Sequence, residues 1–225
     1  HIRAIDPDAT MIVSPADHLI LREEVFRDAI LQGMDFVEEL PSLLTLGVKP
    51  TRAETGYGYI QIGDESKGTI RSVKTFTEKP NRELAQVFVD SGEFFWNTGI
   101  FIWKAGSIIE AIKQYLPEVS IRFEACSDSF GRPGSEQVVQ KQLAACPNIS
   151  IDVGIMEKAT NVYVLCTDFG WSDVGTWGSL YALSQKDTCE NVVLHGRATC
   201  YDSHRNIVST SEKKLVILDG LQDYI

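Results

Sequence analysis

The sequence lacks any long hydrophobic run. No stretch approaches the roughly 20 consecutive apolar residues that a membrane helix requires, and residues 1–7 (HIRAIDP) contain no apolar core of a signal peptide. We therefore expect neither a membrane protein nor a secreted one, and a cytoplasmic location follows as the default.

Paired cysteines and an excess of positive charge are also missing. The five cysteines are scattered, without a CxxC pair or histidines at zinc-ligand spacing, which predicts reduced structural thiols. A formal net charge of -10 argues against nucleic-acid binding, because that mode neutralises many phosphates with a basic surface. If the protein handles phosphate, it must use a few placed cations and a metal ion.

What the chain does contain is a series of short strands and amphipathic helices. With 225 residues and 44% hydrophobic composition, it can bury one substantial core. Apolar runs predict strands at residues 11–13, 43–48, 57–62, 69–76, 94–96, 99–103 and 162–166. Helical spacing covers residues 23–39, 82–89, 108–116 and most of 117–147, with Asn81 as a predicted cap and Thr176 capping a last helix. This alternation predicts an α/β layer fold.

The pattern of apolar and polar residues changes after Asp187. Short apolar runs alternate there with Gly, Asn, Asp or charged turns, which suggests the start of a β-solenoid without a strict repeat. We therefore divide the chain into a main domain over residues 1–187 and a β-module over residues 188–225.

The most informative segment is residues 168–177 (DFGWSDVGTW). Two glycines and two tryptophans form a rigid aromatic turn that would hold Asp173 at a fixed point, which suits a metal ligand. Asp17, in the segment SPADH, follows a predicted buried strand at the edge where open α/β sheets bind ligands. By itself Asp17 could merely cap a turn, but the two carboxylates together could share one Mg²⁺. We interpret the neighbouring His18 as a packing or hydrogen-bonding residue.

Polar residues also occur at the ends of other strands. Glu78 and Lys79 precede a proline, and a bend there would let both side chains enter one site, where the acid accepts sugar hydroxyls and the ammonium meets a phosphate. The alternative is a solvated surface ion pair. Gly58, in the segment TGYGY, lets the backbone approach a ligand closely, although ordinary hairpin packing explains the segment nearly as well.

Two further segments have functional and structural interpretations. In WNTG, Asn97 lies between an aromatic residue and a threonine and is suited to hydroxyl recognition, yet Asn-containing turns before strands are common. In residues 151–158 (IDVGIMEK), Lys158 could supply charge to a phosphate with Asp152 or Glu157 orienting it, or the segment could simply start a half-exposed helix.

In this order, the motifs closely resemble those of the mannose-1-phosphate guanylyltransferases (GDP-mannose pyrophosphorylases) of the sugar-nucleotide nucleotidyltransferase superfamily. The resemblance covers nearly the whole chain, from residues 15–18 to residues 170–177. The element FTEKP is shared with related sugar-nucleotide enzymes, whereas SIDVGIMEK and GWSDVG favour the mannose branch.

The resemblance implies a three-layer α/β/α Rossmann-like nucleotidyltransferase fold with a mixed, mainly parallel sheet. It implies attack of mannose 1-phosphate on the α-phosphorus of GTP, which gives GDP-mannose and pyrophosphate through positioning and charge stabilisation. Asp17 and Asp173 would hold Mg²⁺, and Lys79 would contact the sugar phosphate. Mannose would be bound by Glu78, Asn97 and Gly58, and Lys158 would be a further phosphate contact. A homodimer is also expected, since β-modules appended to this fold often form dimer contacts.

The chain departs from the family pattern at its start. Family members begin with a strand and a glycine-rich loop bearing arginine and lysine that cradles the triphosphate, and no such segment precedes His1. The sequence as printed is therefore expected to have little or no transferase activity, because the charged transition state needs those donors. The alternatives are another hexose-1-phosphate nucleotidyltransferase, or a noncatalytic regulatory or scaffold subunit of the same fold.

Overall fold

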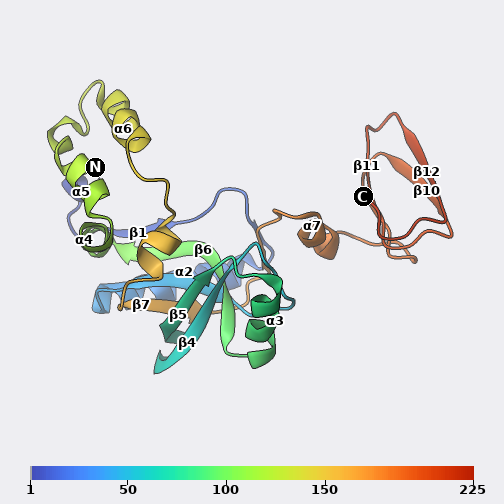
Figure 1. Cartoon of the computed structure of the whole chain (residues 1–225), viewed down its shortest axis with the longest axis horizontal. Coiled ribbons are helices and arrows are strands. Elements are labelled where there is room, and N and C mark those ends of the chain that lie inside the picture. Colours follow the sequence, from blue (N-terminus) through green and yellow to red (C-terminus); the bar gives the residue numbers. More distant parts are fainter. Residues whose placement is uncertain (1) are drawn as a thin grey trace. The chain divides into compact units, whose positions relative to one another are not determined.

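The computed structural model describes residues 2–225, which form two compact units (Figure 1). The first unit comprises the chain up to Ala16 and Ile20–Trp171. The second comprises Asp17–Leu19 together with Ser172–Ile225. The division into a main domain over residues 1–187 and a β-module over residues 188–225 stays a prediction.

A six-stranded sheet organises the first unit. Its strands, in spatial order, are β1 (Thr10–Val13), β6 (Phe94–Lys104), β3 (Leu43–Val48), β7 (Val162–Cys166), β5 (Ile70–Glu78) and β4 (Gly58–Lys67). The first part of β6, residues 94–97, also pairs with β4, and β4 and β5 form a long twisted hairpin (Figure 1).

The sheet is mixed, as predicted, but the expectation of a mainly parallel sheet was wrong. Within residues 2–225 its pairings are antiparallel except that of β3 with β7. The physical reason lies in the connections, because the tight turn at Gly68 forces β4 and β5 to run in opposite directions. The long strand β6 then runs antiparallel to β1, β3 and β4.

Helices pack on both faces of this sheet because alternate residues of its central strand point to opposite sides. The helices of this unit are α1 (Ile2–Ile5), α2 (Glu23–Glu39), α3 (Arg82–Ser91), α4 (Ala105–Tyr115), α5 (Pro117–Glu124) and α6 (Ser135–Ala144). A 3-10 turn, η1 (Ser127–Ser129), lies between α5 and α6, and a π-helical turn, η2 (Asp152–Met156), lies between α6 and β7.

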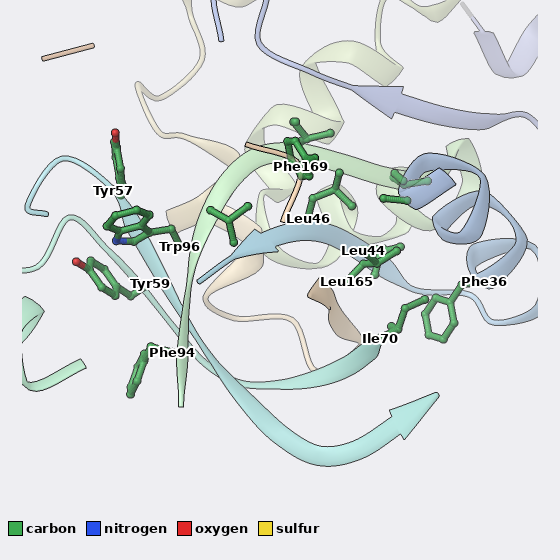
Figure 2. Packing of buried hydrophobic residues seen from close by; sticks show 14 of the residues in the cluster. Phe36, Leu44, Leu46, Tyr57, Tyr59, Ile70, Phe94, Trp96, Leu165 and Phe169 are labelled. Atoms are coloured by element: carbon green, nitrogen blue, oxygen red, sulfur yellow. The ribbon is translucent and has the colours of Figure 1, made fainter. Parts of the chain in front are cut away.

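Two hydrophobic clusters fill the layers. From β3, Leu44 and Leu46 belong to the cluster that includes residues of α2 and α3, shown in Figure 2, whereas Leu43 belongs to the cluster with α4 and η2. Strand β3 forms where it was predicted and is completely buried, in keeping with its largely apolar sequence. Strand β1, in contrast, lies at the sheet edge with Ile12 and Val13 exposed, so the prediction of a buried strand there was wrong.

The second unit contains α7 (Trp177–Leu183) and four short strands, β9 (Val192–His195), β10 (Arg197–Tyr201), β11 (Ile207–Ser209) and β12 (Leu215–Asp219). Strand β9 pairs with β11 and β10 pairs with β12, both in parallel. Two further short strands, β2 (Leu19–Ile20) and β8 (Trp171–Ser172), pair with each other.

Buried asparagines connect successive turns of this C-terminal segment. The Oδ1 atom of Asn191 accepts the backbone N–H of Asn206 at 3.0 Å, and Oδ1 of Asn206 accepts that of Tyr224 at 2.9 Å. Asn191 and Asn206 are 2% and 1% exposed, so these bonds form an internal ladder rather than a solvated turn.

No helix within residues 2–225 has the length and apolar character needed to cross a membrane. The five cysteines are free thiols. Burial raises the pKa of the Cys166 thiol to about 11, which keeps it protonated at neutral pH.

Candidate functional site

The end of β5 brings an acid and a lysine together. Lys79 follows the last residue of the strand and has φ of 48°, a left-handed conformation that is uncommon for a residue with a side chain. This bend lets Lys79 Nζ lie 3.2 Å from Glu78 Oε1. The Glu78 side chain is only 18% exposed, against 64% for Lys79, so the pair differs from a fully solvated surface ion pair.

Gly58 faces both Glu78 and Asn97 in the sheet. It lies opposite Glu78 on one neighbouring strand and opposite Asn97 on the other. A Cβ atom at position 58 would come within 2.5 Å of Glu78 Oε2 and 3.3 Å of Asn97 Cβ. Glycine is therefore needed for the carboxylate to lie over this strand, a role that the sequence did not indicate.

Asn97 is 8% exposed and held on both sides of its amide. Its Oδ1 atom accepts the Thr45 hydroxyl at 2.8 Å and the Gly99 backbone N–H at 3.3 Å. Its Nδ2 donates to Asp152 Oδ1 at 3.0 Å. The amide is therefore part of a buried polar network rather than an exposed turn.

The π-helical turn η2 supplies two acids to this cluster. Asp152 contacts Asn97, and Glu157, at the end of the turn, accepts the backbone N–H of Glu78 at 3.1 Å. We predicted that these acids could orient Lys158, but the structure directs them to Asn97 and Glu78, and Lys158 is exposed. π-helical turns occur frequently at functional sites.

Sequence reasoning missed Thr45, which lies in the middle of a buried strand with an otherwise apolar composition. A polar residue inside such a run needs a buried partner, and this was the available signal. Sequence reasoning identified Asp152 and Glu157 but paired them with Lys158. It expected the start of an ordinary helix, whose residue spacing differs from that of the π-helical turn.

The pKa values of two half-buried acids of the cluster, Glu78 and Asp152, are raised. Burial raises the pKa of the Glu78 carboxyl above its usual range, and the negative charge of Asp152 adds to the effect, while Lys79 opposes it. Burial likewise raises the pKa of Asp152, although hydrogen bonds from its own backbone, Asn97 and Ser150 counteract part of the rise.

In the second unit, Asp173 lies in a strained turn. Its Oδ1 atom accepts the backbone N–H of Gly175 at 3.1 Å and the Ser179 hydroxyl at 3.5 Å. The next residue, Val174, has φ of 51°, which is an outlier for a β-branched side chain. Strain of this kind typically costs about 1–3 kcal/mol and persists where the surroundings fix it, often at functional sites.

Asp17 belongs to the same compact unit as Asp173, although they are far apart in sequence. Leu21 N donates to Gly170 O at 3.3 Å and Arg22 N donates to Phe169 O at 3.0 Å. The chain around Leu21 and the chain around Gly170 therefore run antiparallel to each other. Strands β2 and β8 also pair with each other, and in the sequence Asp17 precedes β2 while Asp173 follows β8.

The donor set of these two acids fits Mg²⁺ better than a transition metal. Among residues 2–225 there is no group of three or more His, Cys, Asp or Glu side chains that could hold a metal ion by itself. Mg²⁺ is commonly bound by one or two carboxylates and keeps several waters or substrate phosphates as its other ligands. Asp17 is exposed and Asp173 is half-buried, so water could complete such a coordination shell.

The fold and these residues together define a mixed α/β protein in which acids, an amide and a lysine gather where β4, β5 and β6 lie beside the turn η2. The model of the nucleotidyl transferase family matches residues 2–190. The chain belongs to this family.

Individual proteins and solved structures are also similar to this chain. The chain is 36% identical to the mannose-1-phosphate guanylyltransferase of Escherichia coli K12 over 228 aligned residues, which cover 98% of the chain and 46% of that protein. It therefore spans about half the length of this relative. A crystal structure described as mannose-1-phosphate geranyltransferase from Thermus thermophilus matches with a TM-score of 0.85 and 31% identity, covering 98% of this chain and 63% of that one. A structure described as mannose-6-phosphate isomerase from Helicobacter pylori matches with a TM-score of 0.64 and 27% identity, covering 74% and 66% of the two chains.

Proposed function

We propose that this chain is the part of a mannose-1-phosphate guanylyltransferase that binds the sugar phosphate. The reaction transfers a guanylyl group from GTP to mannose 1-phosphate and releases pyrophosphate. The observation that supports it most is the cluster of Glu78, Asn97 and Gly58 on adjacent strands, in a chain 36% identical to an E. coli protein of that name.

Within this proposal, each group of the cluster has a chemical role. The Glu78 carboxylate accepts mannose hydroxyls, and the Asn97 amide donates to one of them. Gly58 leaves the space that the Glu78 carboxylate occupies next to Asn97. The Lys79 ammonium, which is largely exposed beside Glu78, meets the sugar phosphate, and Lys158 is a further phosphate contact.

Asp17 and Asp173 are the proposed ligands of Mg²⁺. When bound, the ion would neutralise charge that develops on the phosphates during transfer. The turn at Val174 and the contacts from Gly175 and Ser179 would hold the Asp173 carboxylate in place before the ion arrives. This pre-organisation lowers the cost of assembling the site.

Several finer expectations belong to the same proposal. The parallel pairs and the asparagine ladder support a β-solenoid start over residues 188–225. Family resemblance supports a cytoplasmic homodimer. The 225 residues contain no glycine-rich loop with arginine and lysine, so on their own they should show little transfer.

Isothermal titration of the 225-residue chain with sugar phosphates tests the assignment without requiring turnover. We expect mannose 1-phosphate to bind at least about tenfold more tightly than glucose 1-phosphate, a difference of about 1.4 kcal/mol. A clear preference for glucose 1-phosphate would favour another hexose-1-phosphate nucleotidyltransferase. Absence of binding to any hexose 1-phosphate would favour a noncatalytic subunit.

A further inference from the structure

The Asn97 side chain could in principle lie in two orientations that differ by exchange of its oxygen and nitrogen. An amide offers an acceptor at Oδ1 and two donors at Nδ2, so the exchange reverses what it presents to a ligand. Because Asn97 is buried and its neighbours are fixed strands and turns, the surrounding groups must decide between the two orientations.

Thr45 does not decide the orientation by itself. Its hydroxyl lies 2.8 Å from Asn97 Oδ1 and also 3.1 Å from the carbonyl oxygen of Ile100. If the oxygen and nitrogen of the amide were exchanged, Asn97 Nδ2 could donate to the Thr45 hydroxyl oxygen. The hydroxyl group would then rotate and donate its own proton to the carbonyl oxygen of Ile100. The Gly99 N–H prefers the observed orientation, but at 3.3 Å its bond to Oδ1 is long.

Asp152 does distinguish the two orientations. An ionised carboxylate can only accept hydrogen bonds, so it stabilises the amide with Nδ2 toward it and repels the amide with Oδ1 toward it. The contact of Nδ2 with Asp152 Oδ1 is 3.0 Å long and lies in a partly buried region, where a mismatched pair of acceptors is costly.

Asp152 is itself held firmly. It starts the π-helical turn whose Ile155 and Met156 are 0% and 1% exposed and belong to the hydrophobic cluster beneath the sheet. The acid therefore has a fixed position from which it can orient its neighbour.

We infer that Asp152 is a positioning residue that, with Thr45, locks the Asn97 amide so that one Nδ2 proton stays available for a ligand hydroxyl. Nδ2 uses one proton on Asp152, and its second proton has no partner within residues 2–225. The orientation is a property of the free protein, whereas the identity of the hydroxyl as that of a hexose phosphate rests on the proposed function.

The decisive experiment compares the effect of Asp152→Asn in two backgrounds. Asparagine is isosteric with aspartate but can face Asn97 with either an acceptor or a donor, so it removes the preference without removing volume. We expect Asp152→Asn to weaken mannose 1-phosphate binding about fivefold, the loss of roughly one hydrogen bond. In the Asn97→Ala background, the same change should weaken binding less than twofold, because the residue through which it acts is gone.

Equal losses in both backgrounds, or no loss in the parent chain, would overturn the inference. Thr45 provides a second test. Thr45→Ser keeps the hydroxyl and should bind like the parent, whereas Thr45→Val should weaken binding and show coupling with Asp152→Asn. Thermal denaturation identifies any variant that fails to fold, and the Thr45 pair then carries the test.

A ligand-free measurement separates this inference from the proposed function. The side-chain amide signals of Asn97 in a ¹⁵N spectrum can be assigned by their loss in Asn97→Ala. In the parent chain, one amide proton should exchange slowly because it is bonded to Asp152, and it should exchange faster in Asp152→Asn. If this holds while mannose 1-phosphate does not bind, the proposed function fails and the positioning role stands. If exchange is unchanged by the substitution, the positioning role fails.

Discussion

Gly58 gives the Glu78 carboxylate its place in the site, because a side chain at position 58 would overlap Oε2 at 2.5 Å. We expect Gly58→Ala to displace the flexible end of Glu78 while leaving the sheet folded. Mannose 1-phosphate binding should fall on the order of tenfold, about 1.4 kcal/mol, measured by isothermal titration.

Gly56→Ala is the matched control. A Cβ atom there would meet only Glu54 Oε1 at 3.6 Å, an ordinary contact. Binding by this variant should stay within twofold of the parent chain. If both variants lose affinity equally, the effect comes from the whole loop rather than from the space over Gly58.

Glu78 carries a cost in stability that its role in the site would explain. A carboxyl whose pKa is raised in the folded state destabilises the fold at pH above that raised value, and the penalty disappears as pH falls toward the unfolded value. Glu78→Gln should therefore raise the midpoint of thermal unfolding at pH 7 by about 2–4 °C, if it recovers about 1 kcal/mol.

The same variant should lose sugar-phosphate affinity, because glutamine replaces a charged acceptor. Near pH 4 its stabilising effect should vanish, since Glu78 is then largely protonated in the parent chain as well. Scanning calorimetry at both pH values measures this, and an advantage of equal size at pH 4 would contradict the electrostatic explanation.

Asp173 is the residue on which the proposed metal site most depends. Asp173→Asn should weaken Mg²⁺ binding on the order of tenfold or more with the fold intact, because a neutral amide is a poorer ligand than a carboxylate. Isothermal titration with Mg²⁺ measures this. Asp168→Asn is the control from the same segment, since Asp168 is an exposed acid paired with Arg22. Similar losses in both variants would indicate nonspecific attraction of the cation.

At the scale of elements, two helix caps allow an effect on the free energy of unfolding to be distinguished from an effect on the geometry of the proposed metal site. Asn81 accepts the Leu84 N–H at 2.9 Å at the start of α3, and Thr176 accepts the Ser179 N–H at 3.1 Å at the start of α7. Replacing either residue by alanine should cost about 1 kcal/mol in the free energy of unfolding.

Only the second cap is connected to the proposed metal ligand, because the Ser179 hydroxyl contacts both Thr176 Oγ1 and Asp173 Oδ1. Thr176→Ala should therefore weaken Mg²⁺ binding a few-fold in addition to its cost in stability. Asn81→Ala should leave Mg²⁺ binding unchanged. Equal Mg²⁺ affinities of the two variants would show that α7 does not support Asp173.

At the scale of the whole molecule, the division into two units predicts separable responses to mutation. Asn206 is buried in the ladder of the second unit and bonds to Asn191, Leu221 and Tyr224. Asn206→Ala leaves these partners unsatisfied and should destabilise the second unit by about 2 kcal/mol. Mannose 1-phosphate binding through the first unit should remain within twofold.

Limited proteolysis followed by mass spectrometry measures which part opens first. Cleavage of the Asn206→Ala variant should accelerate within Ser172–Ile225 and remain slow in the sheet of the first unit. Uniform acceleration along the chain would show that the two units unfold as one cooperative body.

Local sequence patterns were sufficient to predict most of the helices and strands. Helix α2 and strand β3 have the bounds that their apolar spacing predicted, and the caps at Asn81 and Thr176 bond as expected. These features depend on neighbours a few residues apart, which the sequence displays directly. The metal role of Asp17 and Asp173 and the ligand roles of Glu78 and Lys79 remain predictions.

The sequence by itself determined the elements, their caps and the motifs of the nucleotidyl transferase family, because periodicity and capping are short-range. Only the tertiary structure decided the mostly antiparallel sheet, the overlap of Gly58 with Glu78 and the bond between Asp152 and Asn97. These depend on strand order and on a π-helical turn, which bring together residues far apart in the chain. Long-range packing rather than local propensity sets such contacts, and the chemistry of the cluster follows from them.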